Sequence, residues 1–317
     1  MVGMRIAILD DYQNVALDLA DWDSLRAEVL VFTDHIADPD ELVRRLAGFD
    51  VVVAMRERTA FDEAVLARLP DLRLLVTTGA RNAAIDVAAA ERHGVVVCGT
   101  GYLPHPTVEL TWALILAARR NLEAETRAMR EGGWQTTLGT GLRGGTLGLL
   151  GLGRLGSEVA RVGQAFGMRT LAWSHNLTTE RAAEHGVTAV SWERLLASSD
   201  VVSVHLVLGE RTRGLVGADA LAAMKPTALL VNTSRGPIVD EDALVRALRD
   251  GTIGGAALDV YDREPLPADH PLRAEPRALL TPHIGFVTRD VYEVFYRDAV
   301  ADIAAYRAGE PVRVLRP

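Results

Sequence analysis

Three side chains in the second half of the chain combine anion binding with proton transfer. Arg235 follows the apolar run 228–231, and its guanidinium could hold a carboxylate through two parallel hydrogen bonds. His283 lies between Pro282 and Gly285, and an imidazole can donate a proton to a carbonyl oxygen or remove one from a hydroxyl near neutral pH. Glu264 could orient that imidazole and favour its charged form. Taken alone, each of the three also fits an ordinary loop position.

A glycine pattern earlier in the chain indicates a phosphate site. Gly151, Gly153 and Gly156 follow the apolar run 146–150 and precede a helical pattern at 157–166. In such a strand-turn-helix, the first glycine permits a tight turn, the second lets the backbone approach a pyrophosphate, and the third lets the helix pack on the strand. The unpaired N–H groups of the helix N-terminus favour negative charge. We therefore predict that the chain binds NAD or NADP.

The elements before this pattern read as one α/β domain. Apolar runs at 5–9, 51–54, 72–77 and 95–98 predict strands, and segments 40–46, 62–69 and 86–93 predict helices that begin with an aspartate. Nearly continuous apolar strands that alternate with helices are typical of a parallel sheet covered on both faces. We expect this domain to span residues 1–100.

The rest of the chain repeats this alternation of apolar strands and helices. Pro104 and Pro106 mark a break, and a long connecting helix is expected from Thr107 to about Arg130. Six strands are predicted at 146–150, 170–173, 201–206, 228–232, 253–258 and 278–281. They predict a doubly wound Rossmann domain over 101–288, with ligands at the carboxyl ends of its strands. A terminal helix at 290–307 is expected to return to the first domain, which residues 289–317 complete.

Composition excludes several classes of partner. The net charge of −8 disfavours a nucleic-acid surface, which needs clustered cations. The single cysteine, Cys98, excludes an intrachain disulfide, suits a reducing compartment and is expected to be buried. The apolar stretch 110–118 is far shorter than the ~20 residues that span a bilayer, and no secretory leader is evident. We expect a cytoplasmic protein without a metal site.

Five segments together resemble the D-isomer-specific 2-hydroxyacid dehydrogenases, a family that includes glyoxylate and hydroxypyruvate reductases and phosphoglycerate dehydrogenases. The resemblance covers nearly the whole chain, and the segments are 144–156, 200–206, 232–237, 257–265 and 281–285. It places the family's catalytic arginine, glutamate and histidine on Arg235, Glu264 and His283. It implies a Rossmann domain inserted in a flavodoxin-like substrate domain that closes over the cofactor. It also implies hydride transfer between NAD(P)H and a 2-keto acid to give a D-2-hydroxy acid, and a homodimer formed through the cofactor domain.

The resemblance further implies which residues contact the ligands. Those expected to contact the cofactor are Thr107, Gly151, Gly153, Arg154, Leu155, Gly156, Ser174, His205, Thr233, Ser234, Asp259 and Gly285. Those expected to contact the substrate are Gly79 and Ala80, through backbone N–H groups, together with Arg56 and Arg235. Arg56 has an alternative interpretation as a surface arginine paired with Glu57.

Some positions depart from the family pattern. Ser174 stands where most NAD-dependent members carry an acidic residue, so the sequence leaves NAD and NADP both open. Arg81 replaces a common glycine and Phe286 a smaller residue, and the sequence assigns neither a role. A second interpretation is a nucleotide-sensing protein resembling the C-terminal-binding corepressors, with little turnover. Formate dehydrogenase chemistry is disfavoured, because such relatives carry glutamine where this chain has Glu264.

Overall fold

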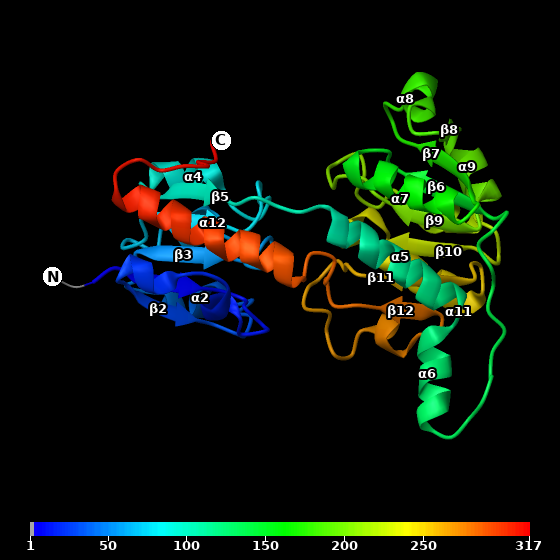
Figure 1. The fold of residues 1–317 in the computed structure, drawn as a ribbon, viewed down its shortest axis with the longest axis horizontal. Coiled ribbons are helices and arrows are strands. Elements are labelled where there is room, and N and C mark those ends of the chain that lie inside the picture. Colours follow the sequence, from blue (N-terminus) through cyan, green and yellow to red (C-terminus); the bar gives the residue numbers. More distant parts are fainter. Residues whose placement is uncertain (1–2) are drawn as a thin grey trace. The chain divides into compact units, whose positions relative to one another are not determined.

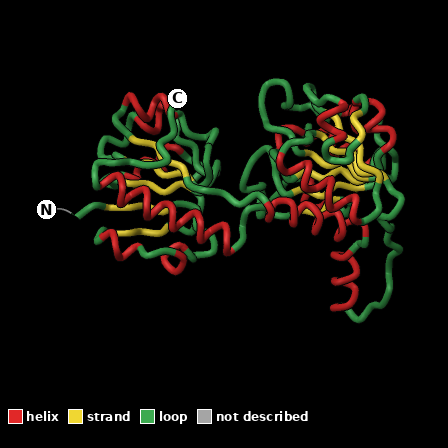
Figure 2. The backbone as a smooth tube through the Cα atoms, turned by 45° about the horizontal axis from the view of Figure 1, so that its top comes forward, coloured by secondary structure: helices red, strands yellow, loops and turns green. Residues whose placement is uncertain are grey.

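A computed structural model of the protein describes residues 3–317 and divides the chain into two compact units. Unit 1 comprises residues 1–103 and 288–317, and unit 2 comprises residues 104–287. Each unit is an α/β layer structure in which helices cover the strands (Figures 1 and 2). Within residues 3–317, the ten pairings between strands are all parallel.

Unit 1 is built on a five-stranded sheet with the order β2-β1-β3-β4-β5, a flavodoxin-like order. The strands are β1 (Arg5–Ile8), β2 (Glu28–Val31), β3 (Val51–Ala54), β4 (Leu74–Thr77) and β5 (Val96–Gly99). The helices are α1 (Ala16–Leu19), η1 (Trp22–Leu25), α2 (Pro39–Leu46), α3 (Glu63–Leu66), α4 (Val87–Arg92) and α12 (Arg289–Arg307). Alternate strand residues pack against α2, α3 and α4, while α12 packs against β4. Both faces of the sheet are therefore buried, as the apolar strands require.

Unit 2 is built on a seven-stranded sheet with the order β12-β11-β10-β9-β6-β7-β8, which is the Rossmann order. The strands are β6 (Thr146–Leu150), β7 (Arg169–Trp173), β8 (Thr188–Ala189), β9 (Val201–Val204), β10 (Leu229–Asn232), β11 (Gly255–Leu258) and β12 (Ala278–Leu280). The helices are α5 (His105–Arg119), α6 (Leu122–Arg130), α7 (Arg154–Ala165), α8 (Thr179–Ala183), α9 (Trp192–Ser198), α10 (Ala218–Ala222), η2 (Gly236–Ile238), α11 (Glu241–Asp250) and η3 (Pro271–Ala274).

Two hydrophobic cores lie on opposite faces of this second sheet. Leu150, Val202 and Leu230 pack with α9, α10 and α11, whereas the neighbouring residues Leu149 and Val231 pack with α5 and α7. Successive residues of a strand point to opposite faces, so fully apolar strands can feed two cores at once. The predicted doubly wound α/β fold is confirmed in both units.

The structure corrects the long helix expected over 107–130. The chain forms α5 and then α6, and Asn121 between them adopts a left-handed backbone with φ 51°. The Thr140 N–H donates to the Arg119 carbonyl at 2.7 Å, so the returning chain satisfies the end of α5. A left-handed residue breaks an α-helix, because it turns the chain out of the helical path. Apolar periodicity across 107–130 did not reveal this break.

Two edge strands, β2 and β8, were not predicted. Neither contains a buried residue, and β8 has only two residues. An edge strand that is only partly covered lacks the apolar run that marked the central strands. Asp62 and Asp86 cap α3 and α4 as expected, but α2 is capped by Asp38. Across residues 3–317, no helix is both long enough and apolar enough to cross a membrane.

Candidate active site

The loops that follow β10, β11 and β12 carry Arg235, Glu264 and His283 to one edge of the unit 2 sheet. Because parallel strands share a direction, their carboxyl ends lie on the same edge. Gly236 brings two of these loops into backbone contact, since a Cβ there would overlap the carbonyl group of Tyr261. The loop that holds Arg235 is therefore fixed against the loop that leads to Glu264.

His283 and Glu264 form a hydrogen-bonded pair. The distance from His283 Nδ1 to Glu264 Oε2 is 2.5 Å, and the side chains are 22% and 28% exposed. The other carboxylate oxygen of Glu264 accepts the Tyr261 N–H at 2.9 Å. Glu264 is thus held by its own loop and fixes Nδ1, which leaves Nε2 as the imidazole nitrogen available for proton transfer.

The backbone around His283 is held by Asp259 and Thr107. The Asp259 carboxylate accepts the N–H groups of Ile284 and Gly285, each at 2.8 Å. Thr107, in the first turn of α5, donates to the Gly285 carbonyl at 3.0 Å. Burial raises the pKa of Asp259, and these hydrogen bonds to the charged carboxylate oppose that shift. His283 itself has a left-handed backbone with φ 53°, so its position depends on these neighbours.

The ring of Phe286 packs against the imidazole of His283. Its ring lies 5.5 Å from the His283 ring, at an interplanar angle of 81°, and the residue is 4% exposed. The Val287 N–H donates to the Ile284 carbonyl and closes the turn that carries Phe286. No role was predicted for Phe286, and the structure places its ring edge-to-face with the imidazole.

Arg235 is partly buried beside the end of β10. Its Nη1 donates to the Ser234 carbonyl at 2.8 Å, and the Asn232 side chain donates to the Arg235 carbonyl at 2.9 Å. Ser234 is held in turn by a hydrogen bond from its hydroxyl to the Leu206 carbonyl. Thr233 shares a hydrogen bond with Thr111 of α5, with 2.8 Å between the hydroxyl oxygens. The predicted cofactor contacts Thr233 and Ser234 therefore belong to the same hydrogen-bonded loop as Arg235.

The glycine turn has the shape that a dinucleotide needs. Gly151 adopts φ +100°, and a Cβ at Gly156 would overlap the Gly151 carbonyl oxygen. A Cβ at Gly153 would meet no atom within 4 Å, so this glycine faces open space directly before α7. The turn is closed on the protein side and open at the helix N-terminus, the place at which such turns bind a pyrophosphate in dinucleotide-binding proteins. These residues fit NAD or NADP.

The remaining predicted cofactor contacts in unit 2 lie around this turn. Arg154 is exposed at the first position of α7, and Leu155 follows it half-buried. The His205 carbonyl lies against Gly151, and burial lowers the pKa of His205 to about 4, so the imidazole is neutral and shares a hydrogen bond with Ser203. Ser174 follows β7 directly, where the Gly151 N–H donates to the Trp173 carbonyl.

The predicted substrate contacts of unit 1 lie at the carboxyl edge of its sheet. Arg56 follows β3 with a left-handed backbone, φ 52°, and its side chain is 17% exposed. Gly79 follows β4 with φ +97°, and a Cβ there would overlap Arg56 Nη1. The guanidinium therefore lies directly over the Gly79 backbone. The alternative pairing with Glu57 is also present, at 3.6 Å from Arg56 Nε, so the ion pair and the placement over Gly79 coexist.

The Gly79 N–H, which was expected to contact the substrate, is hydrogen-bonded to Thr100 instead. That N–H donates to Thr100 Oγ1 at 2.7 Å, so it is satisfied within unit 1, whereas Ala80 is exposed on the same loop. Sequence reasoning did not identify Thr100, nor Asp10 and Asn82, which hold neighbouring loops. Polar residues just beyond the predicted strands 5–9 and 95–98 were the available signal for Asp10 and Thr100.

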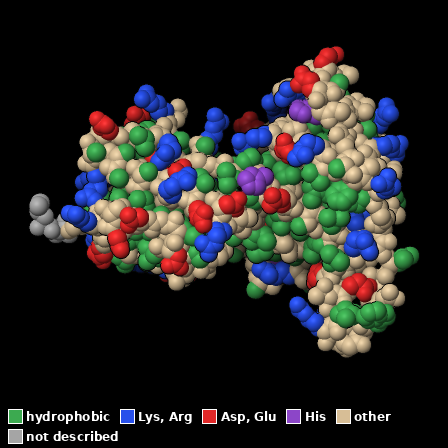
Figure 3. Space-filling view, viewed as in Figure 1, with side chains coloured by type: hydrophobic (Ala, Val, Ile, Leu, Met, Phe, Trp, Pro, Cys, Tyr) green, Lys and Arg blue, Asp and Glu red, His purple; other side chains and the backbone are tan. Residues whose placement is uncertain are grey.

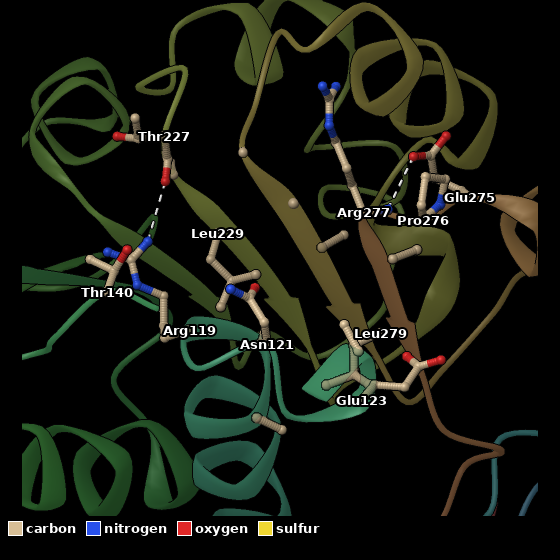
Figure 4. Close-up of a pocket in the computed structure, with 18 of the residues that line it drawn as sticks. Arg119, Asn121, Glu123, Thr140, Thr227, Leu229, Glu275, Pro276, Arg277 and Leu279 are labelled. Atoms are coloured by element: carbon tan, nitrogen blue, oxygen red, sulfur yellow. Dashed lines mark hydrogen bonds between the residues drawn. The ribbon is translucent and has the colours of Figure 1, made fainter. Parts of the chain in front are cut away.

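A cavity of about 510 Å³ lies at the opposite edge of the unit 2 sheet (Figure 4). It borders the amino ends of β10, β11 and β12, together with Arg119, Arg277 and Leu279. Because the strands are parallel, this edge is the one that faces away from Arg235, Glu264 and His283. Among residues 3–317, no three His, Cys, Asp or Glu side chains are placed to hold a metal ion.

Comparisons with known proteins agree with this geometry. A family model described as "D-isomer specific 2-hydroxyacid dehydrogenase, NAD binding domain" matches residues 112–285. The chain is 43% identical to the glyoxylate reductase of Aeropyrum pernix over 78% of this chain and 76% of that protein. It is 35% identical to the D-3-phosphoglycerate dehydrogenase of Archaeoglobus fulgidus, over 98% of this chain and 58% of that longer protein.

The solved structures give the same result. The crystal structure of a phosphoglycerate oxidoreductase from Vibrio cholerae superposes with a TM-score of 0.91 at 39% identity, and the match covers 96% of this chain and 99% of that one. These relatives are named as reductases, dehydrogenases or oxidoreductases. The corepressor-like interpretation is therefore not favoured.

Proposed function

Because the chain belongs to the D-isomer specific 2-hydroxyacid dehydrogenase family and is an NAD(P)-dependent oxidoreductase, we propose that His283, Glu264 and Arg235 carry its chemistry. The observation that supports this assignment is the 2.5 Å hydrogen bond between His283 and Glu264, on the same sheet edge as Arg235. An acid/base pair and a cation on neighbouring loops suit a substrate that carries a carboxylate next to a reacting carbonyl.

His283 moves the proton in this proposal. When bound, the nicotinamide cofactor supplies the hydride for the carbonyl carbon of a 2-keto acid. The Nε2 atom of protonated His283 then gives its proton to the carbonyl oxygen, so a C–H bond and an O–H bond form while the carbonyl π bond breaks and a C–O single bond remains. In the oxidising direction, His283 Nε2 accepts the hydroxyl proton. Glu264 stabilises the protonated imidazole through Nδ1 and keeps Nε2 directed at the substrate.

Arg235 holds the substrate carboxylate in the same proposal. A guanidinium offers two parallel N–H donors that match the two oxygens of a carboxylate. Unit 1 adds the Arg56 guanidinium and the Ala80 N–H as further donors for the anionic part of the substrate. The cofactor is held by the glycine turn at 151–156, with Arg154 and Leu155 at the start of α7, and by Thr107, Ser174, His205, Thr233, Ser234, Asp259 and Gly285 around it.

The substrate we propose is a small 2-keto acid such as glyoxylate or hydroxypyruvate, reduced to the D-2-hydroxy acid. The test is the absorbance decay of NADH and, separately, of NADPH when the purified protein meets glyoxylate, hydroxypyruvate, pyruvate and phenylpyruvate. We expect turnover with at least one of the small acids. Tight cofactor binding without turnover on any acid would contradict the proposal. The same panel decides which of the two cofactors the site with Ser174 prefers.

A homodimer formed through unit 2 completes the proposal. The segment from α6 to residue 138 projects from unit 2, and its apolar side chains are visible in the space-filling view (Figures 1 and 3). Leu122, Met129, Trp134 and Leu138 are 50%, 55%, 73% and 95% exposed. Exposed apolar side chains on one projecting segment are typical of an interaction surface.

We propose the cytoplasm as the compartment of this protein. A single buried cysteine, Cys98, suits the reducing conditions there.

The oligomeric state can be measured by light scattering during gel filtration. We expect the mass of a dimer for the wild type and of a monomer for the double variant Trp134→Ser, Leu138→Asp. Arg161→Asp, a charge change on the exposed face of α7, serves as the control and should leave the dimer intact. A monomeric wild type would contradict this part of the proposal.

A further inference from the structure

The turn that carries Arg56 is held at both ends by side chains outside the described site. It runs from Met55 to Arg58, and the Arg58 N–H donates to the Met55 carbonyl at 3.2 Å. Within it, Arg56 has the left-handed backbone that non-glycine residues rarely adopt. Such a conformation persists only where the surroundings determine it, and it concentrates at functional sites. The contacts around this turn therefore decide where the guanidinium lies.

Asn82 holds the turn on the side of the Gly79 loop. Its Nδ2 donates to the Arg56 carbonyl at 2.5 Å and to Thr77 Oγ1 at 2.8 Å, while its Oδ1 accepts the Ala84 N–H at 2.8 Å. Asn82 is 7% exposed, so these hydrogen bonds form away from water. One buried amide thus ties the backbone of Arg56 to the loop over which its guanidinium lies.

Asp10 holds the other end of the turn. Its carboxylate accepts the Thr59 hydroxyl at 2.6 Å and is 2.9 Å from His35 Nδ1, and its backbone carbonyl accepts Arg58 Nη1 at 2.7 Å. Asp10 is 1% exposed and has a left-handed backbone of its own, φ 57°, two residues after the end of β1. It therefore joins the loops that follow β1, β2 and β3 at a single buried carboxylate.

The Arg56 guanidinium has a defined position within the turn that Asn82 and Asp10 contact. Arg56 Nη1 fills the space of a side chain at Gly79, and the Cζ atom lies 5.3 Å from the centre of the Tyr102 ring. A cation over an aromatic face is oriented as well as attracted. Displacing the turn would move the guanidinium away from both neighbours. Small displacements of groups that bind a substrate are costly, because the binding geometry is lost.

We propose that Asn82 and Asp10 are positioning residues, which clamp the two ends of the 55–58 turn and thereby hold the Arg56 guanidinium over Gly79 to bind the anionic part of the substrate. The inference rests on the proposed function, in which Arg56 contacts the substrate. It assigns a task to a buried polar network in unit 1 that takes no part in hydride or proton transfer.

The test uses the full-length enzyme with its preferred cofactor and keto acid. Asn82→Ala and Thr59→Val each remove hydrogen bonds of the clamp, and we expect each to raise KM for the keto acid roughly tenfold. Turnover and the dissociation constant of the preferred reduced cofactor, measured by its fluorescence, should stay near the wild-type values. Thr59→Ser keeps the hydroxyl and should restore KM. Ser199→Ala, which removes a buried hydroxyl bonded to the Leu195 carbonyl in unit 2, is the matched control.

A double-mutant cycle with Arg56→Met separates positioning from mere stability. If the clamp acts through Arg56, Thr59→Val should add nothing to the KM of the Arg56→Met enzyme. Unchanged KM in both clamp variants, or fully additive effects in the cycle, would overturn the inference. Wild-type KM in Arg56→Met would remove Arg56 from the substrate site and overturn the inference with it, while leaving the role of His283 intact. Should Thr59→Val fail to fold, Asn82→Ala in the same cycle decides the question.

Discussion

The carboxyl edges of the two sheets differ in the chemistry that they present. In unit 2, the loops after β10, β11 and β12 carry a hydrogen-bonded imidazole–carboxylate pair, His283 with Glu264, and the cation Arg235. In unit 1, the loops after β1, β3 and β4 carry Asp10, Arg56 and Gly79, all with left-handed backbones. The first arrangement suits proton transfer, and the second suits holding an anion in place. The same kind of sheet edge thus supports different tasks, because its loops differ in side chains and in backbone conformation.

The largest effect is expected when the imidazole of His283 is removed. His283→Ala should lower kcat by at least roughly a hundredfold, because general acid catalysis contributes that much or more. The NADH dissociation constant should be nearly unchanged, since the glycine turn is intact. His93→Ala, on an exposed histidine paired with Glu63 in unit 1, is the control and should keep full turnover. Near-normal turnover of His283→Ala would remove the residue from the acid/base role.

The next largest effect is expected at Arg235. Arg235→Lys keeps the positive charge but loses the planar two-point contact, so KM for the keto acid should rise by roughly ten- to a hundredfold. Initial rates over a range of keto-acid concentrations give KM and kcat separately. Arg246→Lys, in α11, is a matched control in the same unit. An unchanged KM would count against the proposed grip on the carboxylate.

Two glycine variants test whether the unit 2 edge binds the cofactor and the unit 1 edge binds the substrate. Gly156→Ala should weaken NADH binding by roughly tenfold or more, because its Cβ would overlap the Gly151 carbonyl oxygen within the turn. Gly79→Ala should instead raise KM for the keto acid, because its Cβ would displace Arg56 and its backbone has positive φ. Fluorescence titration and steady-state kinetics measure the two effects. The opposite assignment, with Gly79→Ala impairing cofactor binding, would contradict the comparison.

The smallest effect on catalysis is expected at Asp302, a buried carboxylate of unit 1 outside the proposed site. Burial raises its pKa to about 6, although Arg313 lies 2.9 Å from one oxygen. Because the folded pKa lies above the usual 3.8, this group contributes stability below pH 3.8 that is lost as the pH rises through about 6.

Chemical denaturation of the wild type and of Asp302→Asn from pH 4 to pH 8 tests this sign. Relative to the variant, the wild type should lose roughly 2 kcal/mol of unfolding free energy across that range. The variant's kcat and KM should match the wild type at pH 7. A difference in stability that does not vary with pH would show that Asp302 is not held with a raised pKa.

The amino-acid sequence by itself determined the family, the α/β fold and the cofactor turn. Strands such as 51–54 and 146–150 are apolar throughout because they are buried on both faces, and this local signal survives without tertiary information. The glycines at 151, 153 and 156 were recognisable because backbone geometry within one short turn requires them. Arg235, Glu264 and His283 were identified as candidates from their motifs and from the resemblance that the family match supports.

The hydrogen bonds between polar groups of different loops could be identified only from the tertiary structure. Edge strands β2 and β8 carry no buried run, and the break between α5 and α6 depends on Thr140, which returns from a later segment. The hydrogen bond of Thr100 to Gly79 and the clamp of Asp10 and Asn82 on the Arg56 turn join residues that lie 21 to 49 positions apart in the chain. Such contacts leave no local pattern, because loops from different strands come together only when the sheet has formed.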